Sequence, residues 1–69
     1  MKYIVKKIEF VSFCIEMYAK HFVVSGSVVA NRFDEAGVLD YLLDNYEVLH
    51  TQGWQFILPL INNYIDKQK

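Results

Sequence analysis

A repeating stripe of apolar residues near the start of the chain constrains the fold more than any other feature. Between residues 3 and 22, large apolar side chains recur at alternating steps of four and three residues: Ile4, Ile8, Val11, Ile15, Tyr18 and Phe22. This spacing is typical of one face of an α-helix. Four further residues widen the stripe to more than half of the circumference: Phe10, Phe13, Cys14 and Met17. We therefore expect a long central helix over residues 3–22, covered by other elements or by an interface.

The next segment predicts a shorter helix that begins at a serine. Ser25 is expected to cap a helix over residues 26–35, because its hydroxyl can accept a hydrogen bond from a free main-chain N–H. Val29 and Phe33 lie four residues apart in this helix and form its inner face. The Ser25-Gly26-Ser27 segment could also hold an anion at the helix start, but an ordinary cap explains the same residues and is the favoured interpretation.

A third helix is predicted after Gly37, which stands where the end of a helix often needs a positive φ. It runs from residue 38 to about residue 45, and three leucines face inward: Leu39, Leu42 and Leu43. Residues 46–50 are expected to form a turn or an extended link.

A fourth helix is predicted over residues 52–67, with Thr51 as its cap. Pro59 falls inside this segment, and proline removes a main-chain donor and clashes with the preceding turn. Either the helix kinks at Pro59, or Pro59 begins a shorter helix; we favour the kinked helix. The apolar residues of the segment are Trp54, Ile57, Leu58, Ile61, Tyr64 and Ile65.

These segments together predict an all-α protein, a single domain over residues 1–69 built as a small bundle of three to four helices. The candidate strands at 23–24 and 47–49 are too short to form a sheet. A chain of 69 residues leaves little room for a large enclosed active site beside a stabilising core.

Charge and cysteine content exclude several classes of protein. Seven Lys and Arg against eight Asp and Glu give a net charge of −1, which argues against a dedicated nucleic-acid-binding protein. One cysteine excludes an internal disulfide and a zinc site made of cysteines alone. Charged residues interrupt every long apolar stretch, so we expect no signal peptide and no membrane span. The protein is expected to be cytoplasmic.

His50 is the residue best suited to catalysis, within the polar cluster His50, Thr51, Gln52 and Gly53. A catalytic histidine needs a carboxylate or a nucleophile beside it, and Cys14 could lie near in space. The favoured interpretation is structural, with the ring donating to a main-chain carbonyl near a helix end. We therefore expect no enzymatic activity.

No metal or cofactor site is predicted. His21, His50 and Cys14 lack the spacing of known metal-binding motifs. Cys14 lies in the apolar stripe and is expected to be a small buried hydrophobic residue.

Acidic residues dominate the middle of the chain. Between residues 34 and 47 there are five acidic residues and no basic one: Asp34, Glu35, Asp40, Asp44 and Glu47. Helices over 26–35 and 38–45 are similar to a helix-turn-helix, but this face would repel DNA. A dimeric DNA-binding regulator remains the alternative, through basic residues near the N-terminus: Lys2, Lys6 and Lys7. The acidic residues are either a solvated surface or a patch for a basic partner.

Aromatic residues exceed what so small a core can enclose, since the chain has five Phe, five Tyr and one Trp. We expect some of them to form a surface that another chain covers, because aromatic residues and Met are enriched in interfaces. The candidate surface comprises Phe10, Phe13, Met17, Tyr41, Tyr46 and Trp54, with Asp40, Asp44 and Glu47 as its acidic rim. The predicted function is a non-enzymatic module that binds a protein partner or a second copy of itself.

Three segments carry a resemblance to a known family: residues 10–20, Ser25-Gly26 and residues 37–53. They resemble a small bacterial family catalogued as domain of unknown function 3791, with the segment from Leu49 to Gly53 as the most specific part. The resemblance covers about residues 8–65 and implies a compact helical domain. Members often look like neighbours of genes for toxins of the ADP-ribosyltransferase type, which implies an antitoxin or accessory role. The family supplies no established catalytic residues.

Overall fold

The computed structural model describes the backbone of residues 2–67 and the side chains of residues 4–67. Within this range the chain forms helices and no strand. The five helices are α1 (Lys2–Phe22), α2 (Gly26–Glu35), α3 (Val38–Asp44), α4 (Tyr46–Leu49) and α5 (Trp54–Lys67). The predicted all-α class is confirmed, and α1, α2 and α3 begin and end within one residue of the predicted bounds.

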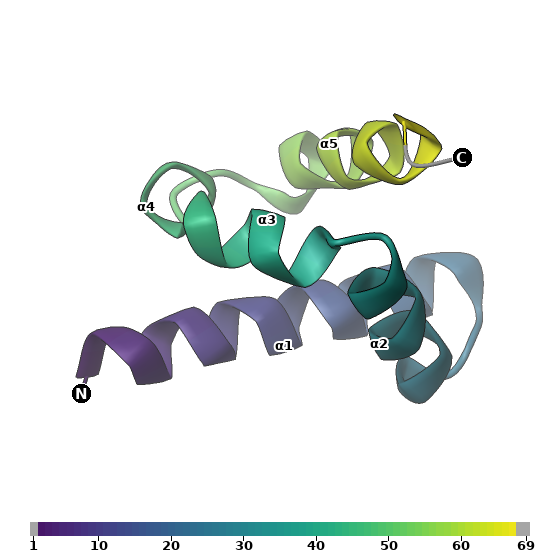
Figure 1. Ribbon diagram of the computed structural model, residues 1–69, viewed down its shortest axis with the longest axis horizontal. Helices are drawn as coiled ribbons and strands as arrows, with labels where there is room; N and C mark the ends of the chain where they lie inside the picture. The colour runs from purple at the N-terminus through teal and green to yellow at the C-terminus, as the bar shows by residue number, and fades with distance from the viewer. Residues whose placement is uncertain (1, 68–69) are drawn as a thin grey trace.

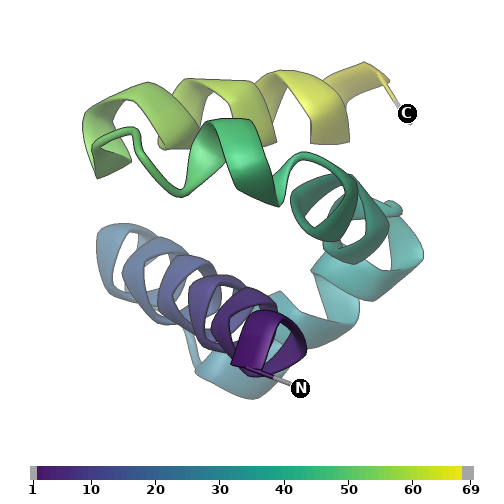
Figure 2. The same cartoon turned by 90° about the vertical axis from the view of Figure 1, so that its left-hand side faces the viewer.

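Helix α1 runs along the length of the molecule, and the other helices lie against one side of it (Figure 1). Helix α2 crosses near the C-terminal end of α1, α3 lies over its middle, and α5 lies beyond α3. Seen from the end at which α1 begins, α1, α2, α3 and α5 surround one interior (Figure 2). Helix α1 therefore forms one wall of this interior and contacts α2, α3 and α5.

The core draws side chains from all five helices. Its buried residues are Cys14, Tyr18 and Ala19 of α1, Val29 and Phe33 of α2, Val38 and Leu42 of α3, Leu49 of α4, and Ile57 and Ile61 of α5. Phe33 is fully buried, and its ring meets the Tyr18 ring edge-on with centroids 5.1 Å apart. The predicted inward faces of α2 and α3 are confirmed at Phe33 and Leu42. Among the described residues, no helix has the length and apolarity needed to cross a membrane.

Two of the four connections between helices follow the predicted capping chemistry. The Val28 amide donates to the Ser25 hydroxyl at 3.3 Å, so Ser25 is the cap of α2. Gly37 has a φ of 75° and joins α2 to α3 in a left-handed conformation that glycine adopts without strain.

The end of α1 has a feature that the sequence did not predict. The Val24 amide donates to the Ala19 carbonyl at 3.0 Å, which closes the last turn and places Val23 in the left-handed region with a φ of 55°. Helices commonly place glycine at this position, because a β-branched side chain is strained there.

The segment after α3 corrects two predictions. Residues 46–50 were expected to form a turn or an extended link, but Tyr46–Leu49 is a short helix, because buried Tyr46 and Leu49 both turn into the core. Thr51 was expected to cap the last helix. Its hydroxyl instead donates to the Val48 carbonyl at 3.0 Å and closes α4, and α5 begins only at Trp54.

Pro59 lies inside α5, which continues without interruption from Trp54 to Lys67. The alternative in which Pro59 begins a shorter helix is wrong. Pro59 is exposed, so the main-chain hydrogen bond that it cannot donate is lost at the solvent side of the helix. The kink remains a prediction.

The apolar stripe of α1 is only partly covered. Val11 and Ile15 are half-buried and Tyr18 is buried, but Ile4 is 58% exposed and Ile8 is 57% exposed. Other helices therefore cover the middle of the stripe, and its start is exposed; that an interface covers the exposed part stays a prediction. The first turns of α1 extend past α4, beyond the helices that cover its middle (Figure 1).

Candidate functional site

The predicted aromatic surface separates into pairs of rings. Phe10 meets Tyr46 edge-on with ring centroids 5.6 Å apart, and Tyr46 is only 7% exposed. This pair joins α1 to α4 on the core side. Tyr46 therefore offers little surface to a partner, and half-buried Phe10 covers part of it.

The other two ring pairs lie at opposite ends of α5. Phe13 is 45% exposed and meets Trp54 with centroids 6.2 Å apart, at the first residue of the helix. Tyr41 stacks on Tyr64 at 4.5 Å, ten residues further along, a separation of about 15 Å. The structure therefore does not bring the predicted aromatic residues into one patch. Met17 is half-buried on α1.

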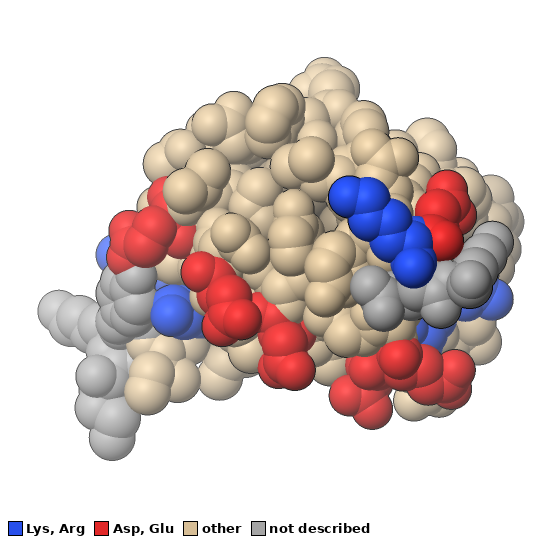
Figure 3. Space-filling view, turned by 45° about the horizontal axis from the view of Figure 1, so that its top comes forward, with Lys and Arg blue, Asp and Glu red and all other residues tan. Residues whose placement is uncertain are grey.

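The acidic residues of the candidate surface lie on the outside of α3 and α4. Asp40, Asp44 and Glu47 are all exposed, and Asp40 and Asp44 lie one turn apart on α3 beside Tyr41. Figure 3 shows acidic side chains in a broken row along one edge of a face that is otherwise largely uncharged. An exposed α3 face of this charge would repel the phosphate backbone, so α3 does not suit a recognition helix.

The structure describes the side chains of two of the three basic residues near the N-terminus. Lys6 is exposed and Lys7 is half-buried, while the side chain of Lys2 lies outside the described residues.

The His50 cluster is bound to main-chain atoms at two helix ends. His50 Nδ1 lies 2.7 Å from the Tyr46 carbonyl, and its ring stacks on the Tyr46 ring at 4.3 Å. The predicted contact with a main-chain carbonyl is confirmed. Gln52 is exposed, and the Gly53 carbonyl accepts from the amides of Phe56 and Ile57 as α5 begins. In the described part of the chain, no carboxylate hydrogen-bonds to His50.

Cys14 is fully buried, as predicted. Burial raises the pKa of its thiol from 9.0 to about 12, so the thiol stays protonated at neutral pH and is a poor nucleophile. Within residues 4–67, no group of three or more His, Cys, Asp and Glu side chains could hold a metal ion.

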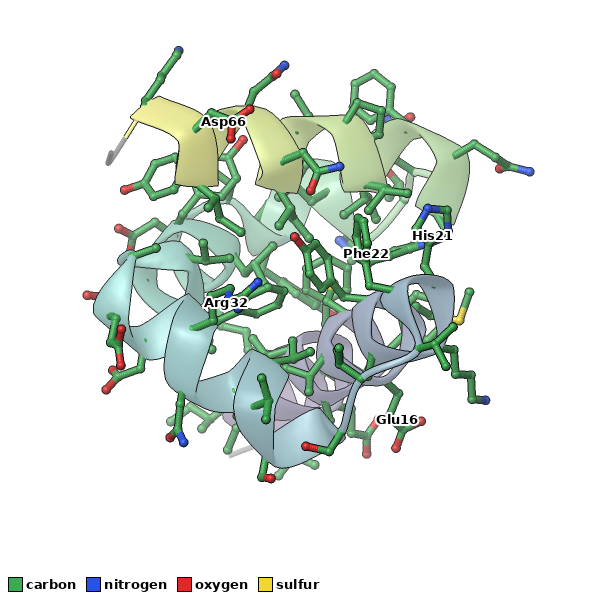
Figure 4. All side chains as sticks on the ribbon, turned by 90° about the vertical axis from the view of Figure 1, so that its right-hand side faces the viewer. Glu16, His21, Phe22, Arg32 and Asp66 are labelled. Carbon is green, nitrogen blue, oxygen red and sulfur yellow. The ribbon has the colours of Figure 1, made fainter. Side chains whose placement is uncertain are left out.

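The structure contains a groove that the sequence analysis missed, which we call the Arg32 groove. Its wider part, of about 580 Å³, is lined by Tyr18, Phe22, Arg32, Asn62, Ile65 and Asp66. Its narrower part, of about 300 Å³, shares Tyr18, Phe22 and Arg32 and adds Val24, Val28 and Val29. Figure 4 shows Phe22 from α1 and Arg32 from α2 pointing toward the same space below α5, which carries Asp66.

Four of the side chains that line the groove are polar: Tyr18, Arg32, Asn62 and Asp66. The Tyr18 hydroxyl donates to Asn62 Oδ1 at 3.0 Å and ties α1 to α5. Burial raises the pKa of Tyr18, the positive charge of Arg32 opposes this shift, and the negative charge of Asp66 adds to it. The Tyr18 hydroxyl is therefore close enough to both charges to be influenced by them.

One sequence signal could have indicated this groove. Arg32 is the only arginine of the chain and the only Lys or Arg between residues 21 and 66. It follows Val28 by one helical turn, on the side of α2 that carries Val29. Phe22 and Asp66, which line the groove with it, are too far away in the sequence for any local pattern to connect them.

Comparison with known proteins gives a match to one family. The family described as "Protein of unknown function (DUF3791)" matches residues 9–68. Neither the curated proteins nor the solved structures give a match.

Proposed function

We propose that this chain, which belongs to the DUF3791 family of proteins of unknown function, is a non-enzymatic module that binds a protein partner in a stoichiometric complex. The observation that carries the proposal is the apolar surface of the described residues. Ten large apolar side chains are between 44% and 88% exposed: Ile4, Val5, Ile8, Phe13, Phe22, Val23, Val24, Val28, Val48 and Phe56.

These exposed side chains are grouped in the structure, which supports an interface. Ile4, Val5 and Ile8 lie together on the first turns of α1. A second group lies where α1 meets α2, and it consists of Phe22, Val23, Val24 and Val28. Contiguous exposed apolar groups of this kind are uncommon on monomeric soluble proteins and mark sites of association.

The residues suited to catalysis support the non-enzymatic part of the proposal. His50 contacts a main-chain carbonyl and a neighbouring ring. Cys14 is enclosed in the core with a neutral thiol. Among the side chains of residues 4–67, no carboxylate or nucleophile hydrogen-bonds to His50 or Cys14, as acid–base or covalent catalysis would require.

The resemblance noted for residues 10–20 and 37–53 supports a more specific partner. It favours an antitoxin-like or accessory role beside a toxin of the ADP-ribosyltransferase type, in a bacterial cytoplasm. In such a complex, exposed Asp40 and Asp44 would face a basic surface of the toxin and speed association.

The test is purification of the tagged chain from its own cells, with mass spectrometry and a light-scattering mass of the complex. We expect one partner in a fixed ratio to the chain. An Ile8→Lys variant should lose that partner, because it places a charge in the exposed apolar group of α1. An Asn31→Lys variant, which adds the same charge at an exposed polar position of α2, should retain it. A monomer without any partner would contradict the proposal.

A further inference from the structure

We propose that the Arg32 groove binds a segment of the partner protein that carries large apolar side chains and one carboxylate, which pairs with Arg32. This inference rests on the proposed function and assigns the chemistry of the partner.

The narrow part of the groove is built for apolar side chains. Phe22, Val24, Val28 and Val29 line its about 300 Å³. Three of these residues are 44–46% exposed: Phe22, Val24 and Val28. A leucine or phenylalanine side chain in this space would remove apolar surface on both molecules from water.

Arg32 determines the charge of the ligand. Of the described residues that line the narrow part of the groove, it is the only charged one. Among the described residues, its guanidinium makes no hydrogen bond and no ion pair, so its donors are available. A guanidinium pairs with a carboxylate through two parallel hydrogen bonds, and neighbouring apolar walls reduce the screening by water.

Asp66 limits the ligand to one carboxylate. It lines the wider part of the groove, on α5, and a second acidic group entering there would meet a like charge. The ligand is therefore oriented, with its carboxylate toward α2 and its apolar residues against the end of α1.

Val23 provides an independent observation beside the groove. Val23 is 88% exposed and has a φ of 55°. It directly precedes Val24, which lines the narrow part of the groove. A β-branched residue in the left-handed region reduces the stability of the fold, and Val23 gains almost no burial in return. Strain that persists at an exposed apolar position is explained if the side chain contacts a partner.

The first experiment uses a library of random peptides selected on the purified chain. We expect the selected sequences to share one Asp or Glu flanked by large apolar residues. One such peptide is then made in two forms, with its Glu and with Gln in its place.

Binding of these two peptides is measured to the wild type and to three variants. Arg32→Gln should weaken binding of the Glu peptide about tenfold and leave the Gln peptide unchanged, because the two changes remove the same ion pair. Lys20→Gln, at an exposed position of α1 outside the groove, should bind both peptides as the wild type does. Val23→Gly should raise the melting temperature and still weaken binding, a combination that a purely structural role of Val23 does not produce.

The single arginine supplies a direct readout. The chain has one arginine Nε–H signal in ¹⁵N NMR spectra, from Arg32, and it should shift on titration with the Glu peptide. Selected peptides without an acidic residue, an unmoved signal, or equal affinity of Arg32→Gln for both peptides would overturn the inference. A homodimer in light scattering that Arg32→Gln dissociates would also overturn it, because a second copy would then occupy the groove.

The outcome separates this inference from the proposed function. If Arg32→Gln binds the stoichiometric partner with the same affinity as the wild type does, the groove assignment is wrong and the partner-binding function stands. If the wild-type chain retains no partner at all, the proposed function itself is wrong.

Discussion

The middle and the start of α1 carry the same kind of side chains at the same helical spacing, yet they are in different environments. Val11 and Ile15 are half-buried, and Tyr18 is buried against Phe33 of α2 and Asn62 of α5. Ile4 and Ile8 are each more than half exposed. The difference comes from what covers the helix, since the stripe itself is continuous.

Helix length explains the difference. Helix α1 has 21 residues and is about 31 Å long, whereas α2 with 10 residues and α3 with 7 residues span about 15 Å and 10 Å. The shorter helices cover only part of α1, and the apolar surface beyond them remains available for association. Apolar periodicity therefore identifies the inner face of a helix without showing how far along it the core extends.

The largest expected effect on stability concerns Phe33 of α2, which packs against the covered part of α1. Replacing Phe33 by Ala removes the ring that packs against Tyr18 and leaves a cavity at a fully buried position. We expect a loss of about 3–5 kcal/mol in the free energy of unfolding, measured by chemical denaturation. For a domain this small, such a loss approaches the whole stability.

A matched phenylalanine outside the core provides the control. Phe56 is 51% exposed on α5, and Phe56→Ala should cost no more than about 1 kcal/mol. Equal losses for Phe33→Ala and Phe56→Ala would contradict the division into covered and uncovered surface.

The second prediction concerns Cys14, also in the covered part of α1. Burial raises the pKa of its thiol from 9.0 to about 12, so the unfolded chain releases this proton at a lower pH than the folded chain does. The stabilising contribution is complete below pH 9.0 and is lost as the pH rises toward 12, on the order of 1.4 kcal/mol per pH unit. Denaturant titrations at about pH 8 and pH 10 should show this loss.

Cys14→Ala is the control for the titration, because it removes the thiol from the same site. The variant should be less stable at neutral pH, through the cavity it leaves, but its stability should change less between the two pH values. A native thiol that reacts rapidly with alkylating reagents at neutral pH would contradict the assigned burial.

Much of the fold could be predicted because local chemistry determines it. The bounds of α2, the Ser25 cap and the left-handed Gly37 follow from side chains that act within a few residues of themselves. The burial of Cys14 followed from its position in the α1 stripe. Helix α4 could not be predicted, because its four residues are too few to show a period. Thr51 had two helix ends within reach, and composition does not show which one its hydroxyl serves.

The candidate site was less predictable, because it depends on contacts between distant segments. Tyr18 and Asn62, which form the hydrogen bond within the Arg32 groove, are 44 residues apart in the sequence. The prediction of one aromatic surface was wrong for two reasons. Tyr46 is buried, and Trp54 and Tyr64 lie far apart along α5. Ring content indicated that some aromatic residues would be exposed, but not which of them.

The third prediction tests the other end of α1, where Val23 is strained. Val23→Gly should stabilise the fold by about 1 kcal/mol, because glycine accepts a positive φ while Val23 loses almost no burial. The measurement is the melting temperature, which should rise by several degrees. Val24→Gly is the control, since Val24 has no positive φ and lines the groove. That change should not raise the melting temperature.

The smallest effect on stability is expected at the start of α1, where the comparison is sharpest. Ile8→Ala should change the free energy of unfolding by less than about 0.5 kcal/mol, because the side chain is exposed and alanine favours the helix. Ile15 is also an isoleucine of this stripe. Ile15→Ala should lower the free energy of unfolding by about 1–2 kcal/mol, because Ile15 packs against the core. If the exposed start of α1 serves association, Ile8→Ala should weaken partner binding more than Ile15→Ala does, once each variant is compared under conditions where it is folded. Ile15→Ala, in the covered part of the helix, would then reduce stability, and Ile8→Ala, in the uncovered part, would reduce binding. A loss of stability at Ile8 as large as that at Ile15 would show that the first turns of α1 belong to the core.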